Sequence, residues 1–275
     1  MFEETFVLII IRTLLVFVAI IVLSAPVVWA DTDTLLAAAE AGHRSAENRT
    51  RNNVRHPVAT LEFFGIHADM TVVEISPGGG WYTEILADFL RDNGKLYAAN
   101  YDPESEEEYY RTNARRFLEK LAADPAIYGQ VIPTVFDPPA KLDAAPPGSA
   151  DMVLTFRNLH NWMEEGSAEV AMSAMHRALK PGGILGIVQH RQDASIQQDP
   201  RAASGYVRQD YVIALAEAAG FTLVASSEIN VNSKDTKDHP EGVWTLPPTY
   251  ELGDENRDKY QAIGESDRMT LKFVK

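Results

Sequence analysis

Residues 71–83 read TVVEISPGGGWYT, which places a carboxylate and a glycine cluster between an apolar run and a helical pattern. This order predicts a strand, a tight turn and a helix. Glycines allow a positive φ and let a ligand approach the backbone, and the free N–H groups at a helix start face whatever fills the turn. The carboxylate of Glu74 repels a phosphate but accepts hydroxyl or ammonium groups. The segment therefore predicts a nucleoside site rather than a pyrophosphate site.

Two other apolar runs also lead into side chains that could do chemistry. One is followed by Asn158 and His160, and the other by His190 and Arg191. In doubly wound sheets, ligands bind at the carboxyl ends of strands. A histidine can accept a proton near neutral pH, so His160 and His190 are candidate general bases, and Arg191 is a candidate for orienting an anionic acceptor. A hydrogen-bonded structural role for His160 stays open.

A ribose-binding acid is expected about 20 residues after the last glycine of a nucleotide-binding turn. The residue 20 positions after Gly80 (100 − 80 = 20) is Asn100, which is not acidic, and Asp102 is the nearest carboxylate that could take its place. Asp102 could instead cap a helix expected over 104–122, since Asp before Pro is typical of a helix start. Both roles for Asp102 stay open.

The run from Glu74 to Gly80 resembles the first motif of class I S-adenosylmethionine-dependent methyltransferases, E/D-x-G-x-G-x-G. Ser76 stands at the first glycine position, and Gly78 and Gly80 match the other two. The sequence LKPGG at 179–183, a helix stop and turn, is a frequent companion of that motif.

The chain most resembles the signal-peptide-bearing predicted methyltransferases of bacteria, over residues 43–275. The resemblance implies S-adenosyl-L-methionine as the cofactor. It implies cofactor contacts for Glu74, Ser76, Pro77, Gly78, Gly79, Gly80, Asn100, Tyr101, Asp102, Asp137 and Asn158. Asp137 would lie near the adenine amine, although Asp137 followed by two prolines also fits a plain turn. The Asp/Asn-Pro-aromatic motif of adenine amino-methylation does not follow the run 151–156, which speaks against nucleic-acid bases as acceptors.

The elements around these residues predict an α/β fold: a doubly wound, Rossmann-like sheet of seven strands, mostly parallel with an antiparallel last strand, and helices on both faces. The expected strands are 71–75, 95–99, 130–135, 151–156, 184–189, 221–225 and 269–274. Helices are expected over 33–48, 81–94, 104–122, 166–179 and 206–220, with Pro57 ending an N-terminal helix. The long segment 226–268 has little periodicity but contains aromatic residues, so we expect an insertion that forms a lid and substrate wall.

The first thirty residues have a different composition. Residues 13–29 carry no charge, and Val28-Trp29-Ala30 places small residues at the −3 and −1 positions before Asp31. This pattern predicts a signal peptide over 1–30 that is cleaved after Ala30, leaving a single domain, 31–275, in the periplasm or secreted. The alternative is an uncleaved inner-membrane anchor, because the apolar stretch approaches the roughly 20 residues of a membrane span.

The chain has a net charge of −14 and no cysteine. The charge disfavours nucleic acid and anionic membrane surfaces as partners. The absence of cysteine excludes disulfides, thiolate zinc sites and cysteine nucleophiles. Four arginines between positions 44 and 55 depart from the acidic character: they either meet an anionic substrate or form a solvated helix face, and the second interpretation is favoured.

These observations predict an S-adenosylmethionine-dependent methyltransferase that acts on oxygen or nitrogen of a small molecule, with an anionic acceptor left open. The alternative is a non-catalytic protein that binds an adenosyl ligand, because Ser76 and Asn100 depart from the family pattern. A hydrolase with a metal bound by His160, His190 and His239 is a third hypothesis. No close-spaced histidine pair supports it, and no metal site is predicted.

Overall fold

The computed structural model describes residues 29–275. The predicted leader or anchor over 1–30 lies, up to residue 28, outside the described residues and stays a prediction. Within residues 29–275, the helices are all too short or too polar to cross a membrane.

A seven-stranded sheet with the order β3-β2-β1-β4-β5-β7-β6 forms the centre of the domain. Its strands are β1 Thr71–Ile75, β2 Lys95–Asn100, β3 Ile132–Val135, β4 Ala150–Phe156, β5 Leu179–His190, β6 Thr222–Ser227 and β7 Arg268–Val274. Strands β1 to β5 are parallel to one another, and β7 lies antiparallel between β5 and β6. The predicted fold class, including the antiparallel last strand, is confirmed.

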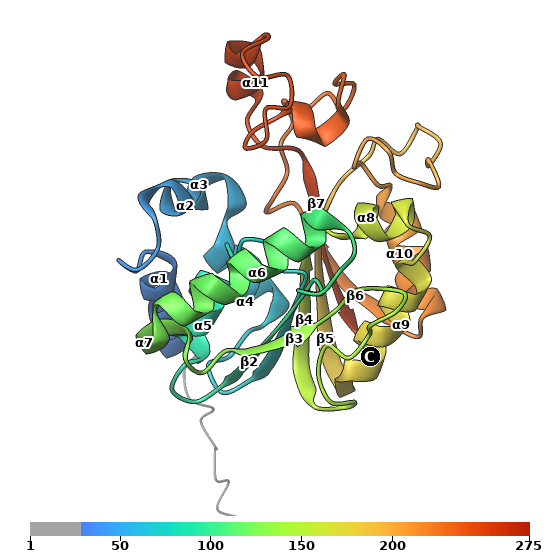
Figure 1. Cartoon of the computed structure of the whole chain (residues 1–275). Helices are drawn as coiled ribbons and strands as arrows, with labels where there is room; N and C mark the ends of the chain where they lie inside the picture. Colours follow the sequence, from blue (N-terminus) through green and yellow to red (C-terminus); the bar gives the residue numbers. More distant parts are fainter. Residues whose placement is uncertain (1–28) are drawn as a thin grey trace, which may run out of the picture.

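Helices cover both faces of this sheet (Figure 1). They are α1 Trp29–Ala39, α2 Ala46–Thr50, α3 Asn52–Arg55, α4 Pro57–Phe64, α5 Thr83–Leu90, α6 Glu108–Ala123, α7 Pro125–Tyr128, α8 Leu159–Glu164, α9 Ala168–Ala178, α10 Gln209–Ala218, the 3₁₀ helix η1 Gly242–Thr245 and α11 Arg257–Ile263. Side chains alternate between faces along β1. Val73 and Ile75 pack on the side of α8, α9 and α10, whereas Val72 packs on the side of α4, α5 and α6.

The N-terminal helices differ from the prediction. The expected helix over 33–48 is divided into α1 and α2, because the chain turns around Gly42 and the Ser45 hydroxyl then caps α2 by accepting from the Asn48 N–H at 3.1 Å. A helix does end just before Pro57, because α3 stops at Arg55 with His56 as its C-cap. Pro57 then occupies the first turn of α4, where its missing N–H costs nothing. α4 ends at Gly65, which adopts the left-handed conformation.

The helix expected from residue 104 begins later, at Glu108. The Asp102 carboxylate accepts from the Glu104 N–H at 3.0 Å, and the Ser105 hydroxyl accepts from the Glu107 N–H at 3.2 Å. Such local side-chain bonds compete with helical ones and hold the segment as turns. Asp102 therefore caps a turn, and the prediction that it starts the helix is wrong.

The segment between β6 and β7 rises above the carboxyl ends of the parallel strands (Figure 1). It carries η1 and α11 and has its own buried side chains, Val243, Leu246 and Tyr260. The insertion is thus a folded element at the edge of the sheet where β1 and β4 end.

Candidate functional site

A cavity of about 490 Å³ lies where the glycine turn, the end of β4, the end of β5, the N-terminal helices and the insertion meet. This volume is within the range of small-molecule sites. The insertion contributes one wall, which includes Trp244, Glu265 and Ser266. Of the predicted site residues, the cavity brings together Ser76, Pro77, Gly78, Gly79, Tyr101, Asn158, His160 and His190.

The glycine turn forms the floor of the cavity. Ser76, Gly78 and Gly80 have φ angles of 47°, 58° and 80°, so the turn takes a positive φ three times. A Cβ placed on Gly78 or Gly79 would meet no atom within 4 Å, which means that the backbone is bare on the side of the cavity. Gly80 differs, because a Cβ there would lie 3.0 Å from the Phe117 ring. Gly78 and Gly79 thus leave room for a ligand, whereas Gly80 serves packing.

Ser76 offers this floor a free polar group. Its side chain is buried and its hydroxyl has no hydrogen-bond partner. A buried polar group without a partner is costly unless a ligand or water satisfies it. The orphaned hydroxyl and the bare backbone beside it fit a ligand that lies along the turn.

Glu74 lies just below the turn and outside the cavity lining. Its buried carboxylate accepts a hydrogen bond of 2.6 Å from the Thr83 hydroxyl. Burial raises the pKa of Glu74 to about 7, although the Thr83 bond and the Lys120 charge oppose the rise. The carboxylate is therefore a buried group that holds the turn to α5.

Asn100, at the end of β2, and Asn158, the N-cap of α8 after β4, support the floor of the cavity. The Asn158 amide donates to the Ile75 carbonyl at 2.9 Å and to the Thr155 hydroxyl at 3.0 Å. The Asn100 amide donates to the Gly78 carbonyl at 3.3 Å, and its own buried oxygen has no partner. Asn100 lines a separate cavity of about 260 Å³ beside α6.

The two aspartates predicted at the cofactor lie outside the main cavity. Asp102 forms an ion pair with Lys141, which holds the pKa of that carboxyl below its ordinary value. Asp137 borders a small space next to Tyr101, and burial raises its pKa. Neither residue is brought to the glycine turn, so their roles as ligands stay predictions.

His160 is buried in the cavity wall, and its neighbours define its tautomer. The Gln189 amide nitrogen lies 3.1 Å from the Gly205 carbonyl and 3.2 Å from His160 Nδ1. A carbonyl oxygen only accepts hydrogen bonds, so the Gln189 atom that faces the Gly205 carbonyl must be the NH₂ nitrogen. This nitrogen therefore also donates to His160 Nδ1. Burial lowers the pKa of His160 to about 4. At neutral pH the ring is uncharged with its proton on Nε2, and it can donate a hydrogen bond.

His190 has a different partner. Its Nδ1 lies 2.5 Å from the Ser266 hydroxyl of the insertion, and its ring centroid is 5.4 Å from that of His160. Burial, followed by the influence of His160, Arg157 and Arg268, lowers the pKa of His190 well below its ordinary value. When Nδ1–H donates to the hydroxyl, Nε2 keeps a free lone pair. Of the two histidines, only His190 has a neutral tautomer that fits these contacts and can accept a proton.

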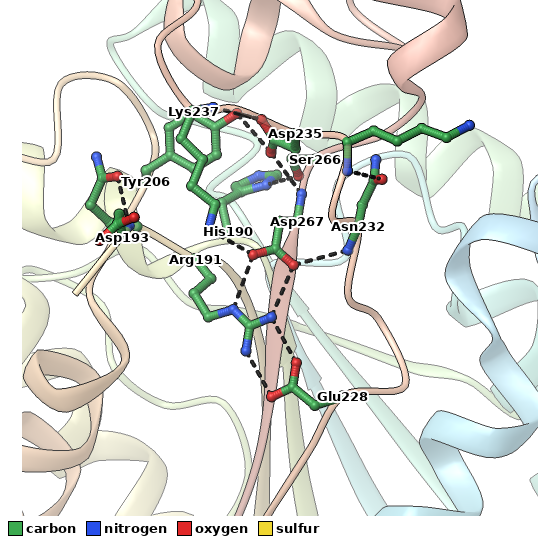
Figure 2. Close-up of polar contacts among 12 residues, drawn as sticks. His190, Arg191, Asp193, Tyr206, Glu228, Asn232, Asp235, Lys237, Ser266 and Asp267 are labelled. Atoms are coloured by element: carbon green, nitrogen blue, oxygen red, sulfur yellow. Dashed lines mark hydrogen bonds and ion pairs between the residues drawn. The ribbon is translucent and has the colours of Figure 1, made fainter. Parts of the chain in front are cut away.

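Arg191 does not line this cavity and forms part of the anchor of the insertion. Figure 2 shows its guanidinium between Asp267 and Glu228, with bonds of 3.0 and 3.1 Å to the first and 2.8 Å to the second. These contacts raise the pKa of Arg191 further above its already high value. His160 and His190 line the main cavity, whereas Arg191 lines a different one, so the structure does not bring Arg191 together with the two histidines.

Two arginines that the sequence placed on a solvated face instead line the cavity. Glu265 accepts from Arg51 at 2.8 Å and from Arg55 at 2.9 and 3.1 Å. Arg157, at the end of β4, lines the same cavity with a φ of 63°. The basic patch in an acidic chain was the only signal for Arg51 and Arg55, and their partner lies 210 to 214 residues away.

Among residues 29–275, no three histidine, aspartate or glutamate side chains lie so that they could hold a metal ion. His239, the third member of the metal hypothesis, is bonded to Asp235 at 2.9 Å. This buried pair belongs to the support of the insertion.

The comparisons with known proteins agree with this fold. Residues 73–187 match the family model described as methyltransferase domain. A SAM-dependent methyltransferase from Aquifex aeolicus is similar with a TM-score of 0.55 and 15% identity, over 82% of this chain and 92% of the other. The [4+2]-cyclase SpnF has a TM-score of 0.55 and 16% identity, over 90% and 93% of the two chains. No curated protein sequence matches this chain.

The chain thus has the fold of class I methyltransferases. Its central part, residues 73–187, matches the methyltransferase domain family.

Proposed function

We propose that this protein is an S-adenosylmethionine-dependent methyltransferase that acts on an oxygen or nitrogen of a small molecule. The observation that carries the proposal is one cavity that joins the bare turn at Gly78 and Gly79 with the neutral side chain of His190. The methyltransferase domain match supports S-adenosylmethionine as the cofactor.

The residues around the turn fit that cofactor. Ser76 presents a buried hydroxyl without a partner at the main cavity, and Asn100 presents a buried oxygen without a partner beside the neighbouring cavity. An adenosyl ligand has the hydroxyl and amine groups to satisfy such atoms. Glu74 holds the turn from below. When bound, S-adenosylmethionine supplies an electrophilic methyl group. The protein's own contribution is to bring an acceptor beside it, and such proximity can lower a barrier by several kcal/mol.

The two histidines take different roles in this proposal. His190 accepts the proton of the acceptor at Nε2, while Ser266 holds its Nδ1. His160 donates from Nε2 and orients the acceptor, since its Nδ1 is occupied by Gln189. The insertion, packed against His160 through Trp244 at a ring distance of 5.6 Å, closes the cavity on one side and limits water.

Isothermal titration of the purified protein with S-adenosylmethionine and S-adenosylhomocysteine tests the cofactor. We expect one site per chain for both compounds. Heat from neither compound, together with no thermal shift, contradicts the proposal.

A non-catalytic adenosyl-binding protein is the second candidate. It is favoured by Asn100, which replaces an acid and uses its amide to hold the Gly78 carbonyl. Such a protein binds both compounds but releases no S-adenosylhomocysteine with any member of a panel of hydroxyl and amine acceptors. The proposed enzyme releases it with at least one of them.

We also propose that the domain is exported, on the basis of the apolar segment before Asp31. Edman sequencing of the mature protein from its native compartment should begin at Asp31. A chain that keeps residues 1–30 and fractionates with the inner membrane would favour the anchor, and a full-length chain in the cytosol would contradict both.

A further inference from the structure

Three arginines that line the cavity and Arg268 next to them carry more positive charge than the protein neutralises. Glu265 accepts from Arg51 and Arg55, and also from Arg268 at 3.1 Å. Arg157 lines the same cavity and interacts electrostatically with Glu265, Arg268 and Arg51. The group thus contains four guanidinium groups and one carboxylate, a formal balance of 4 − 1 = +3. In a chain with a net charge of −14, this is a strong local reversal.

Arg157 is the least compensated member. Among residues 29–275 its side chain donates no hydrogen bond and forms no ion pair. Burial lowers the pKa of its guanidinium to about 10, so it stays charged at neutral pH. Arg157 is half-buried, and the charge of Glu265 is its main compensation, without a hydrogen bond. A half-buried cation that no side chain binds is a suitable partner for a ligand of opposite charge.

The backbone is bent to place Arg157 there. Its φ of 63° is uncommon for a residue with a long side chain, and its N–H is fixed to the Val188 carbonyl at 2.7 Å. Strained residues that the surrounding structure holds in place are concentrated at functional sites. Arg51 adds a second unused donor, because its Nη2 is buried without a partner.

No other group in this part of the cavity offsets the arginines. His160 and His190 are neutral, since burial lowers the pKa of both. Tyr82 is also uncharged, because burial raises its pKa to about 12. Glu265 is therefore the only carboxylate among the described residues that line the cavity, and it is already shared by three arginines.

We propose that the methyl acceptor is an anion, with a carboxylate or phosphate group that binds Arg157 and the unused donor of Arg51. The role of the anion as methyl acceptor rests on the proposed function, whereas the anion site itself does not depend on methyl transfer. A guanidinium suits both anions because it can form two parallel bonds to their oxygens.

The cofactor also carries a carboxylate, so the experiment must separate the two anions. Isothermal titration should be run on the full chain saturated with S-adenosylhomocysteine. Malonate, inorganic phosphate and the neutral isostere malonamide are the probes. We expect a single site for malonate or phosphate and no binding of malonamide. Binding of malonate alone identifies a carboxylate acceptor, and binding of phosphate alone identifies a phosphorylated one.

Variants test the assignment of residues. Arg157→Gln should weaken anion binding about 10- to 100-fold, the loss expected for a charge-assisted hydrogen bond, while S-adenosylhomocysteine binds as before. Arg116→Gln removes the same charge from an exposed position on α6 and should change neither affinity. Should Arg157→Gln fail to fold, Arg51→Gln provides the second measurement, with about a tenfold loss.

Three results overturn the proposal. They are no anion binding to the S-adenosylhomocysteine complex, anion binding that S-adenosylhomocysteine abolishes, and anion binding that the arginine variants leave unchanged. The second result would assign the arginines to the carboxylate of the cofactor. Anion binding that depends on Arg157 in a protein that does not bind S-adenosylhomocysteine would keep the anion site and refute the methyltransferase.

Discussion

Replacing Glu265 by glutamine tests whether this carboxylate holds the insertion against the N-terminal helices. Arg55 and Arg268 are only 4% and 3% exposed, so each would remain buried after losing its counterion. Removing one partner of a buried ion pair typically destabilises by about 3–5 kcal/mol. The glutamine keeps one acceptor oxygen, so we expect the lower end of this range, a decrease of about 3 kcal/mol in the free energy of unfolding.

Glu228→Gln is the matched control. Glu228 also pairs with an arginine, but 63% of its side chain is exposed and Arg191 keeps Asp267 as a second partner. The expected loss is about 0–1 kcal/mol, as for other exposed pairs. Urea unfolding at pH 7, followed by circular dichroism, should therefore lower the midpoint by about 1 M for Glu265→Gln if the slope is about 3 kcal/mol/M. Equal midpoints for the two variants would refute the reasoning.

Three further predictions concern the turn, the histidines and the buried carboxylate. Gly79→Ala should change the free energy of unfolding by no more than about 0.5 kcal/mol, because the added Cβ meets no atom within 4 Å. It should weaken S-adenosylhomocysteine binding in titrations. Gly80→Ala, at a φ of 80°, should instead lower the urea midpoint by the equivalent of about 1–3 kcal/mol. His190→Gln should lower kcat for methyl transfer about 10²- to 10⁴-fold with unchanged cofactor affinity, whereas His160→Gln, which can still donate a hydrogen bond, should lower it less; equal losses would contradict the assigned roles. Glu74 has a pKa of about 7 in the folded protein against 4.5 when unfolded. Between these pH values the folded state holds a proton that the unfolded state has released. The free energy of unfolding should therefore fall by on the order of 3 kcal/mol as pH rises from about 4.5 to 7. Urea midpoints measured against pH should lose that slope in Glu74→Gln, and an unchanged slope would show that another group causes it.

Local patterns in the sequence predicted the sheet and the turn well. The strand Thr71–Ile75 and the packing of Ile85, Leu86 and Phe89 in the following helix follow from apolar runs and spacing over a few residues. The long insertion was recognised because its polar, aperiodic sequence lies between two apolar runs that predict strands. These features depend on neighbours in the chain, which is the information that periodicity carries.

The parts that the sequence did not predict depend on partners far along the chain. The arginines near position 50 look like a solvated face until Glu265 is placed beside them. Arg191 was grouped with His190 because both follow one strand. Adjacent residues of an extended chain point to opposite sides, so this rule could have predicted that the two side chains lie apart. In the structure His190 lines the cavity, whereas Arg191 binds Asp267.

The position of Glu265 connects the fold to the choice of acceptor. The same carboxylate that fixes the insertion to the N-terminal helices also occupies three of the four guanidinium groups, and so leaves Arg157 as the one free cation among the described residues that line the cavity. A neutral acceptor would cover Arg157 without supplying an opposite charge, which is unfavourable for a cation. An anionic acceptor supplies that charge. It would also raise the pKa of the nearby His190 ring and make its Nε2 a stronger proton acceptor when the cavity is filled. Histidine signals in ¹⁵N NMR should therefore titrate at higher pH with malonate or phosphate bound than without. If His190 titrates at the same pH in both states, the bound anion does not make His190 a stronger proton acceptor.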